Sequence, residues 1–177
     1  MNTKLEKWEF INMKLVDLID KIKHNDDECN IGELALEFYE NGNLRVIGNY
    51  KNGEPNGEWK YFHNNGNLWC IDNYRNGYQH GEWQRFDENG NLTWIEKWKN
   101  GREHGEWKHF YENGNLWCID NYENGKPHGE WKTYYENGNL WKIENWENGK
   151  RRGEWKDFDE NGNLELIEKW ENGELLL

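Results

Sequence analysis

The ten residues Asn65–Tyr74 read NGNLWCIDNY, and Asn113–Tyr122 spell the same ten letters again. The leading NGNL also occurs outside these two copies, always at a spacing of 24 residues, and it begins at Asn41, Asn65, Asn89, Asn113, Asn137 and Asn161. A fixed period of this length is typical of repeat arrays, in which each unit stacks on its neighbours. The sequence therefore predicts six 24-residue repeats over residues 32–177.

A second Asn-Gly pair occurs in every repeat, beginning at Asn52, Asn76, Asn100, Asn124, Asn148 and Asn172. Asn-Gly favours two-residue type I′ hairpin turns, because Asn and Gly both tolerate positive φ. Two such turns per repeat indicate two strands per repeat, or about twelve strands. The expected fold is mainly β, an elongated single-layer antiparallel β-meander of stacked hairpins with an N-terminal capping α-helix.

Two-residue turns would also fix which strand positions face each other. They place Trp59 opposite Asp72, Phe62 opposite Trp69, and Cys70 opposite Trp83, and they pair Glu82 with Lys97 and Glu154 with Lys169. Alternation of side chains along a strand then assigns two faces. The first is expected to carry Trp59, Leu68, Tyr74 and Trp83, and the second Phe62, Trp69 and Ile71.

The N-terminal segment, residues 1–31, has a different pattern. Thr3 and Glu6 resemble a helix capping box, and apolar residues follow at spacings of three and four. The predicted amphipathic helix either covers the open edge of the first hairpin or mediates dimerisation or partner binding. No signal peptide and no apolar stretch of about 20 residues is apparent, so a cytoplasmic protein is expected.

Composition narrows the classes of partner. The net charge is -12 at pH 7, which disfavours direct contact with nucleic acid or with an anionic membrane. The 13 tryptophans argue against disorder, because large rings can stabilise a thin fold. The three cysteines are too few and too scattered for a disulfide framework.

No catalytic, metal or cofactor site is expected from the motifs. Phosphate-binding loops, zinc-protease helices and serine-hydrolase elbows are all missing from the sequence. His80, His104 and His128 recur at intervals of 24 residues, which would space them roughly 10 Å apart, too wide for one zinc ion. Cys70 and Cys118 are expected to be free, packed thiols about 19 Å apart.

The repeat has the form G-E-W-x-x-F/Y-x-x-N-G-N-L-x-x-I-x-x-Y/W-x-N-G, as in Gly57–Leu68 and the turn that follows. This form resembles the MORN repeat, specifically its bacterial variant, over residues 32–177. The resemblance implies β-hairpins stacked edge to edge and a scaffold for protein or lipid contact. It also implies a link to antitoxin or immunity components, which occur among bacterial members of the variant type.

One column of the repeat varies between very different residues, and it supplies three of the candidate binding residues. It reads Arg45, Trp69, Thr93, Trp117, Trp141 and Glu165. A position that tolerates such different residues is expected to be solvent-accessible, and exposed aromatic rings anchor interfaces. The alternative is that each ring lies flat and covers the sheet. The predicted partner-binding residues are Trp69, Trp94, Trp117 and Trp141 with the acids Asp72, Glu96, Asp120 and Glu144, although a row of acids is usually a solvated face.

The expected function is a non-enzymatic protein-binding scaffold that neutralises or inhibits a partner. Acidic rows beside exposed tryptophans suit a basic protein, such as a toxin, a nuclease or another effector. The alternative is a carbohydrate- or choline-binding module, since aromatic rings can cage quaternary ammonium groups. The uncapped last strand near Leu177 and the N-terminal helix each offer a surface for a homodimer.

Overall fold

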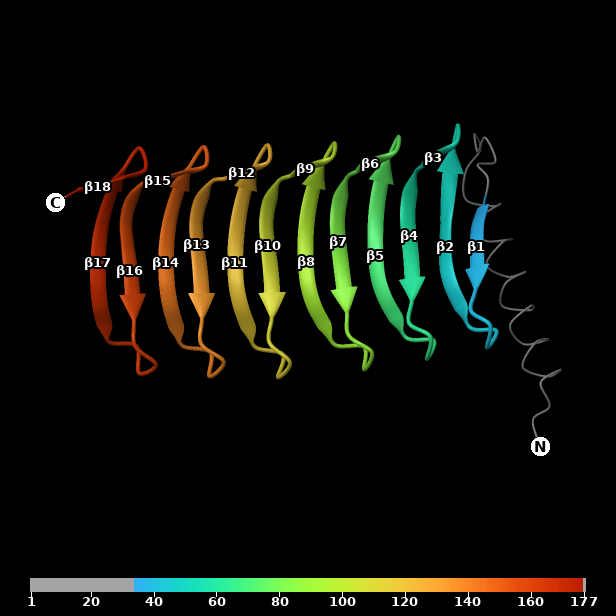
Figure 1. Cartoon of the computed structure of the whole chain (residues 1–177), viewed down its shortest axis with the longest axis horizontal. Coiled ribbons are helices and arrows are strands. Elements are labelled where there is room, and N and C mark those ends of the chain that lie inside the picture. The colour runs from blue at the N-terminus through green and yellow to red at the C-terminus, as the bar shows by residue number, and fades with distance from the viewer. Residues whose placement is uncertain (1–33, 177) are drawn as a thin grey trace. The chain divides into compact units, whose positions relative to one another are not determined.

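The computed structural model describes residues 34–176, which form one antiparallel sheet (Figure 1). The predicted N-terminal helix lies outside the described residues. Within residues 34–176 no helix is long and apolar enough to cross a membrane. The strands are β1 Leu34–Phe38, β2 Leu44–Lys51, β3 Glu54–Pro55, β4 Gly57–Phe62, β5 Leu68–Arg75, β6 Tyr78–Gln79, β7 Gly81–Phe86, β8 Leu92–Lys99, β9 Arg102–Glu103, β10 Gly105–Phe110, β11 Leu116–Glu123, β12 Lys126–Pro127, β13 Gly129–Tyr134, β14 Leu140–Glu147, β15 Lys150–Arg151, β16 Gly153–Phe158, β17 Leu164–Glu171 and β18 Glu174–Leu176.

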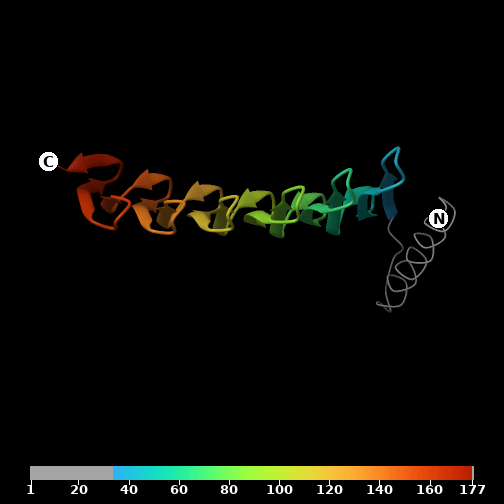
Figure 2. The same ribbon diagram turned by 90° about the horizontal axis from the view of Figure 1, so that it is seen from below.

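The strands follow one another across the sheet in sequence order, as a meander requires. The inner eight-residue strands each pair with a six-residue strand on both sides, as β5 does with β4 and β7. Figure 1 shows the NGNL turns at one end of the strands and the second Asn-Gly turns at the other end. Figure 2 shows the strands as a single row. The predicted single-layer antiparallel meander is confirmed.

The second Asn-Gly turn of each repeat is the predicted two-residue hairpin. Asn76 has φ 50° and Gly77 has φ 78°, so both residues occupy the left-handed region that a type I′ turn needs. Arg75 pairs directly with Tyr78 across this turn.

The NGNL turns are different, and the prediction of a two-residue turn there is wrong. Gly66 has φ 92°, whereas Asn65 does not have a positive φ. The Gly66 amide donates to the His63 carbonyl at 2.9 Å, and the His63 amide donates to the Asn67 carbonyl at 2.8 Å. This is a three-residue loop, a type I turn completed by a glycine in the left-handed region. Asn65 serves through its side chain, which donates to the Glu88 carbonyl of the next repeat at 2.9 Å.

The longer loop shifts the strand register near each NGNL turn. Trp59 lies opposite Asp72 as predicted, but Phe62 pairs with Leu68 rather than with Trp69, because a β-bulge separates the two pairs. Two residues of the bulged strand, Trp69 and Cys70, then face one residue of β4.

The bulge also corrects the predicted faces. The ring of Trp69 contacts Tyr61 at a centroid distance of 6.3 Å, and Tyr61 stacks on Trp59 at the same distance. Trp69 therefore lies on the face of Trp59, not on the opposite face. Leu68 moves with its partner Phe62 to the face of Ile71.

A second irregularity interrupts the strand between β6 and β7. Gly81 has φ 80°, and Cys70 pairs with Arg85 instead of the predicted Trp83. The shift is two residues, an even number, so it leaves the face of each side chain unchanged. The predicted pairs of Glu82 with Lys97 and Glu154 with Lys169 are confirmed.

A continuous row of aromatic rings forms the core of the sheet, on the face that carries Trp59. Neighbouring ring centroids lie between 4.9 and 6.2 Å apart. The row runs through Tyr50, Trp59, Tyr74, Trp83, Trp98, Trp107, Tyr122, Trp131, Trp146, Trp155 and Trp170. Each contact of this kind contributes about 0.5–1.5 kcal/mol beyond area burial, so the row links the repeats energetically as well as spatially.

Candidate protein-binding face

We call the face that carries the aromatic row the tryptophan face, and the opposite face, which carries Ile71, the isoleucine face. Two columns of the tryptophan face lie opposite each other in all six repeats. The first column reads Glu37, Tyr61, Arg85, His109, Thr133 and Asp157. The second reads Val46, Cys70, Trp94, Cys118, Lys142 and Leu166. The first column thus holds six residue types in six repeats.

The isoleucine face, by contrast, is nearly uniform. The column of Ile71 is isoleucine in every repeat. Neighbouring lysines and glutamates pair with each other, as Lys60 does with Glu58 at 2.8 Å and Lys108 with Glu106 at 2.8 Å. Such exposed pairs contribute little to stability, but they neutralise each other. The positions whose residue type differs between repeats therefore lie mainly on the tryptophan face.

The four predicted tryptophans all lie about half exposed on this face. The exposed fractions are 47% for Trp69, 44% for Trp94, 42% for Trp117 and 44% for Trp141. Each ring rests on a neighbouring ring, for example Trp94 on His109 at 4.9 Å. Both sequence interpretations hold in part, because the rings cover their neighbours and still present nearly half of their surface to solvent.

The predicted acids are less accessible than the tryptophans. Asp72 is 5% exposed and Glu96 is 9% exposed, so the expectation of a solvated face is wrong for these two positions. Asp72 accepts a hydrogen bond from the Arg85 guanidinium at 2.5 Å. Glu96 accepts one from the indole N–H of Trp98 at 3.1 Å. These two carboxylates are already satisfied within the sheet.

Glu144 is half-buried and forms a salt bridge with Lys142. Its carboxylate lies 3.3 Å from Lys142 Nζ, which also lies 3.8 Å from Asp157. The indole nitrogen of Trp146 is buried without a hydrogen-bond partner, although the equivalent nitrogen of Trp98 donates to Glu96. Glu144 therefore pairs with the lysine, and it does not accept the indole hydrogen bond that Glu96 accepts from Trp98.

Asp120 has the same sequence context as Asp72 but a different environment. The position of Arg85 is taken by Thr133, which faces Cys118 across the strands. Burial, and then the Glu144 carboxylate, raise the pKa of Asp120 to about 6. Burial likewise raises the pKa of the Cys118 thiol to about 12 and lowers the pKa of His109. A neutral ring, a neutral thiol and a poorly compensated carboxyl therefore lie together in the fourth repeat.

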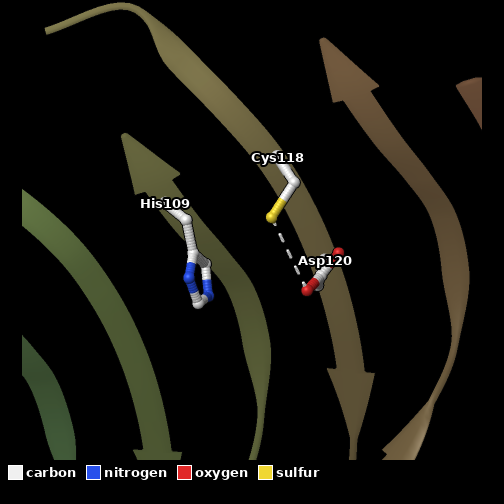
Figure 3. Close-up of side chains that lie close together, drawn as sticks. All are labelled: His109, Cys118 and Asp120. Carbon is white, nitrogen blue, oxygen red and sulfur yellow. Dashed lines mark hydrogen bonds between the residues drawn. The ribbon is translucent and has the colours of Figure 1, made fainter. Parts of the chain in front are cut away.

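These three side chains point toward one another from neighbouring strands (Figure 3). The donor atoms of His109, Cys118 and Asp120 all lie within 4.8 Å of one another, and this is the one such group of three in the described part of the chain. Sequence reasoning missed it, because His109 belongs to a column without recurrent histidine and meets Cys118 only through strand pairing. The recurrent His80, His104 and His128 form no such group among the described residues.

Comparison with protein families agrees with the period and with the fold. The model of the MORN repeat variant matches residues 34–52, 55–76, 79–101, 103–126, 127–148 and 151–172. A comparison with curated proteins gives no match. The six matched segments cover most of the chain and coincide with the six structural repeats, and the chain therefore belongs to the MORN repeat variant family.

Proposed function

We propose that this MORN repeat variant protein is a non-enzymatic scaffold that binds a basic protein on its tryptophan face and inhibits it, as an antitoxin or immunity protein does. MORN repeats are protein- or membrane-binding modules, which supports a binding role. One observation carries the proposal: the two facing columns that differ between repeats lie on the same face as four half-exposed tryptophans.

Tryptophans of this kind suit the centre of an interface. Aromatic anchors supply most of the binding energy at interfaces, and the surrounding contacts mainly exclude water. Trp69 and Trp117 occupy equivalent positions two repeats apart, so an extended partner surface can contact both. The differing side chains between them give each repeat its own chemistry, which a uniform face would not provide.

The charge of the chain supports a basic partner. The net charge is -12, and carboxylates such as Glu37, Asp157 and Glu165 stand in the variable columns. Long-range attraction between opposite charges speeds association and disfavours wrong partners. An inhibitor of a nuclease is one form of this proposal, because an acidic surface can occupy a site that normally receives a nucleic-acid backbone.

The experiment isolates a co-purifying basic protein from the source cells and measures its affinity for purified variants. Trp69→Ala combined with Trp117→Ala is expected to weaken binding by about 30-fold or more, the effect of losing anchors worth at least about 2 kcal/mol. The matched control, Lys60→Ala with Lys108→Ala on the isoleucine face, is expected to change the affinity by less than about threefold.

Inhibition is read separately, as the activity of the partner with and without the scaffold. Equal affinity of the tryptophan variant and the control would overturn the assignment of the face. Retention on choline or glycan resin, lost in the tryptophan variant, would favour the carbohydrate- or choline-binding alternative. Binding to anionic vesicles at physiological salt would instead place the chain among membrane tethers.

A further inference from the structure

The fourth repeat holds a cluster of nitrogen, sulfur and oxygen donors that the proposed function does not use. β10 and β11 are antiparallel, and His109 lies directly opposite Cys118. Asp120 follows Cys118 by two residues, so its side chain is on the same face of the sheet. Figure 3 shows the three side chains converging between the two strands.

We propose that His109, Cys118 and Asp120 bind a zinc ion. Zinc accepts imidazole nitrogen, thiolate sulfur and carboxylate oxygen in one site, at bond lengths of about 2.0–2.3 Å. Tetrahedral bonds of this length put neighbouring donor atoms about 3.5 Å apart. Cys118 Sγ already lies 3.9 Å from Asp120 Oδ2, and all three donors are within 4.8 Å of one another. Small side-chain rotations therefore suffice to close the site.

His109 also has a ring nitrogen that the sheet leaves unused. Its Nδ1 atom is buried and has no hydrogen-bond partner among the described residues. Nδ1 of His80, His104 and His128 shares this feature, but of the four histidines only His109 belongs to a group of three donor side chains within residues 34–176. A buried polar atom without a partner is destabilising, and coordination of zinc through that nitrogen would satisfy it. On binding, the thiol proton of Cys118 leaves to solvent as the sulfur–zinc bond forms, because the thiolate is the form that binds zinc.

The second repeat provides a natural comparison, because it contains the same ten residues. Cys70 and Asp72 take the places of Cys118 and Asp120, but Tyr61 replaces the histidine. The Arg85 guanidinium also donates to Asp72 at 2.5 Å, so a cation already neutralises that carboxylate. The identical stretch is therefore expected to bind zinc only in the fourth repeat.

Three protein ligands leave one position of a tetrahedral zinc open, for water or for a side chain of another molecule. The rings of Trp94 and Trp117 flank His109, with centroids 4.9 and 5.8 Å away. The site thus lies among the half-exposed tryptophans of the tryptophan face. Zinc binding itself needs no partner, so its test is independent of the proposed function.

The experiment uses the full chain, freed of metal by a chelator and titrated with zinc against a chromophoric competitor. One tight site per chain is expected. Cys118→Ser and His109→Tyr are each expected to weaken zinc binding by at least ~100-fold, because each removes a ligand. Cys70→Ser is the matched control and should leave the affinity unchanged. Tyrosine already occupies the equivalent position of the second repeat, so His109→Tyr is compatible with the fold.

Cobalt provides a second readout that reports the ligand type directly. The chain loaded with Co²⁺ should show thiolate-to-metal charge-transfer absorption, present in Cys70→Ser and missing in Cys118→Ser. The proposal is overturned if no tight zinc site is found, or if Cys118→Ser binds zinc as well as the unchanged chain does. Loss of binding in His104→Ala with retention in His109→Tyr would equally overturn it.

Discussion

Replacing Arg85 by threonine removes the cation that compensates a buried carboxylate. Asp72 is 5% exposed, and the guanidinium is its charged partner. Threonine is a natural choice, because Thr133 occupies the equivalent position two repeats later. Arg85→Thr should therefore give Asp72 an environment close to that of Asp120, with Glu96 in the position of Glu144 and Tyr61 in that of His109.

The size of the effect can be worked out from Asp120, whose pKa is raised to about 6. The ordinary pKa of an aspartate is about 3.9, and each pKa unit corresponds to about 1.4 kcal/mol. Two units would give roughly 3 kcal/mol, but burial already raises the pKa of Asp72 with Arg85 in place, so the further rise on losing Arg85 is smaller. We expect Arg85→Thr to lose about 1–2 kcal/mol of unfolding free energy at pH 8.

The loss should depend on pH in a defined direction. A carboxyl group whose pKa is higher in the folded protein than in the unfolded chain destabilises the fold above the folded pKa. That penalty falls as the pH drops through the folded value and vanishes below the unfolded one. The deficit of Arg85→Thr relative to the unchanged chain should therefore shrink as the pH falls from about 6, the pKa of Asp120, toward the lower pKa that Asp72 has beside Arg85.

The assay is urea denaturation followed by tryptophan fluorescence, at pH 8 and at pH 4.5, with chelator present. Asp72→Asn in the Arg85→Thr background is the control, and it should recover most of the loss at pH 8, because no charge is left buried. An equal deficit at both pH values would refute the reasoning. So would a double variant that is no more stable than Arg85→Thr alone.

Three further predictions concern the fold, and unfolding free energies test all of them. Gly48→Ala should cost about 1–3 kcal/mol and alter tryptophan fluorescence, because the added methyl would lie within 2.6 Å of the neighbouring indole ring. Asn76→Gly should change the unfolding free energy by less than about 0.5 kcal/mol, because Asn76 has a φ of 50° that glycine adopts easily. Asn65→Gly should cost about 1–2 kcal/mol, because it removes two side-chain hydrogen bonds. Equal effects of the two substitutions would contradict the turn assignment. Trp83→Ala should cost about 3–5 kcal/mol, because it removes a buried ring from the aromatic row. Trp117→Ala should cost less than about 1.5 kcal/mol, because this ring is 42% exposed. The reverse order would contradict the assignment of Trp83 to the core and of Trp117 to the binding face.

The sequence predicts the repeat number, the strand type and one of the two turns correctly. Its error at NGNL has a physical cause. Asn-Gly is compatible with a type I′ turn and also with the last residues of a longer loop, and the letters alone do not distinguish them. The distinction comes from Asn65, whose side chain donates to the Glu88 carbonyl of the next repeat. That bond exists only when the repeats stack.

The loop that the sequence mispredicts also determines which residues form the candidate binding face. One extra loop residue creates the bulge that turns Trp69 to the face of Trp59, so the predicted binding tryptophans and the aromatic row share one face. The tryptophan column itself could be recognised from its variation between repeats. The column of Tyr61 and His109 varies even more, but its importance is visible only once strand pairing places it opposite the column of Cys70 and Cys118.

The recurring NGNL, Asn-Gly and GEW residues determined the period of the chain, its paired strands and its family, because turn and packing residues must recur wherever the backbone recurs. Tertiary structure alone decided how the two copies of NGNLWCIDNY differ. Asp72 meets Arg85, whereas Asp120 lies beside His109 and Cys118 without such a cation. The reason is that a strand presents half of its side chains to neighbours far away in sequence, so identical segments acquire the chemistry of the strands beside them.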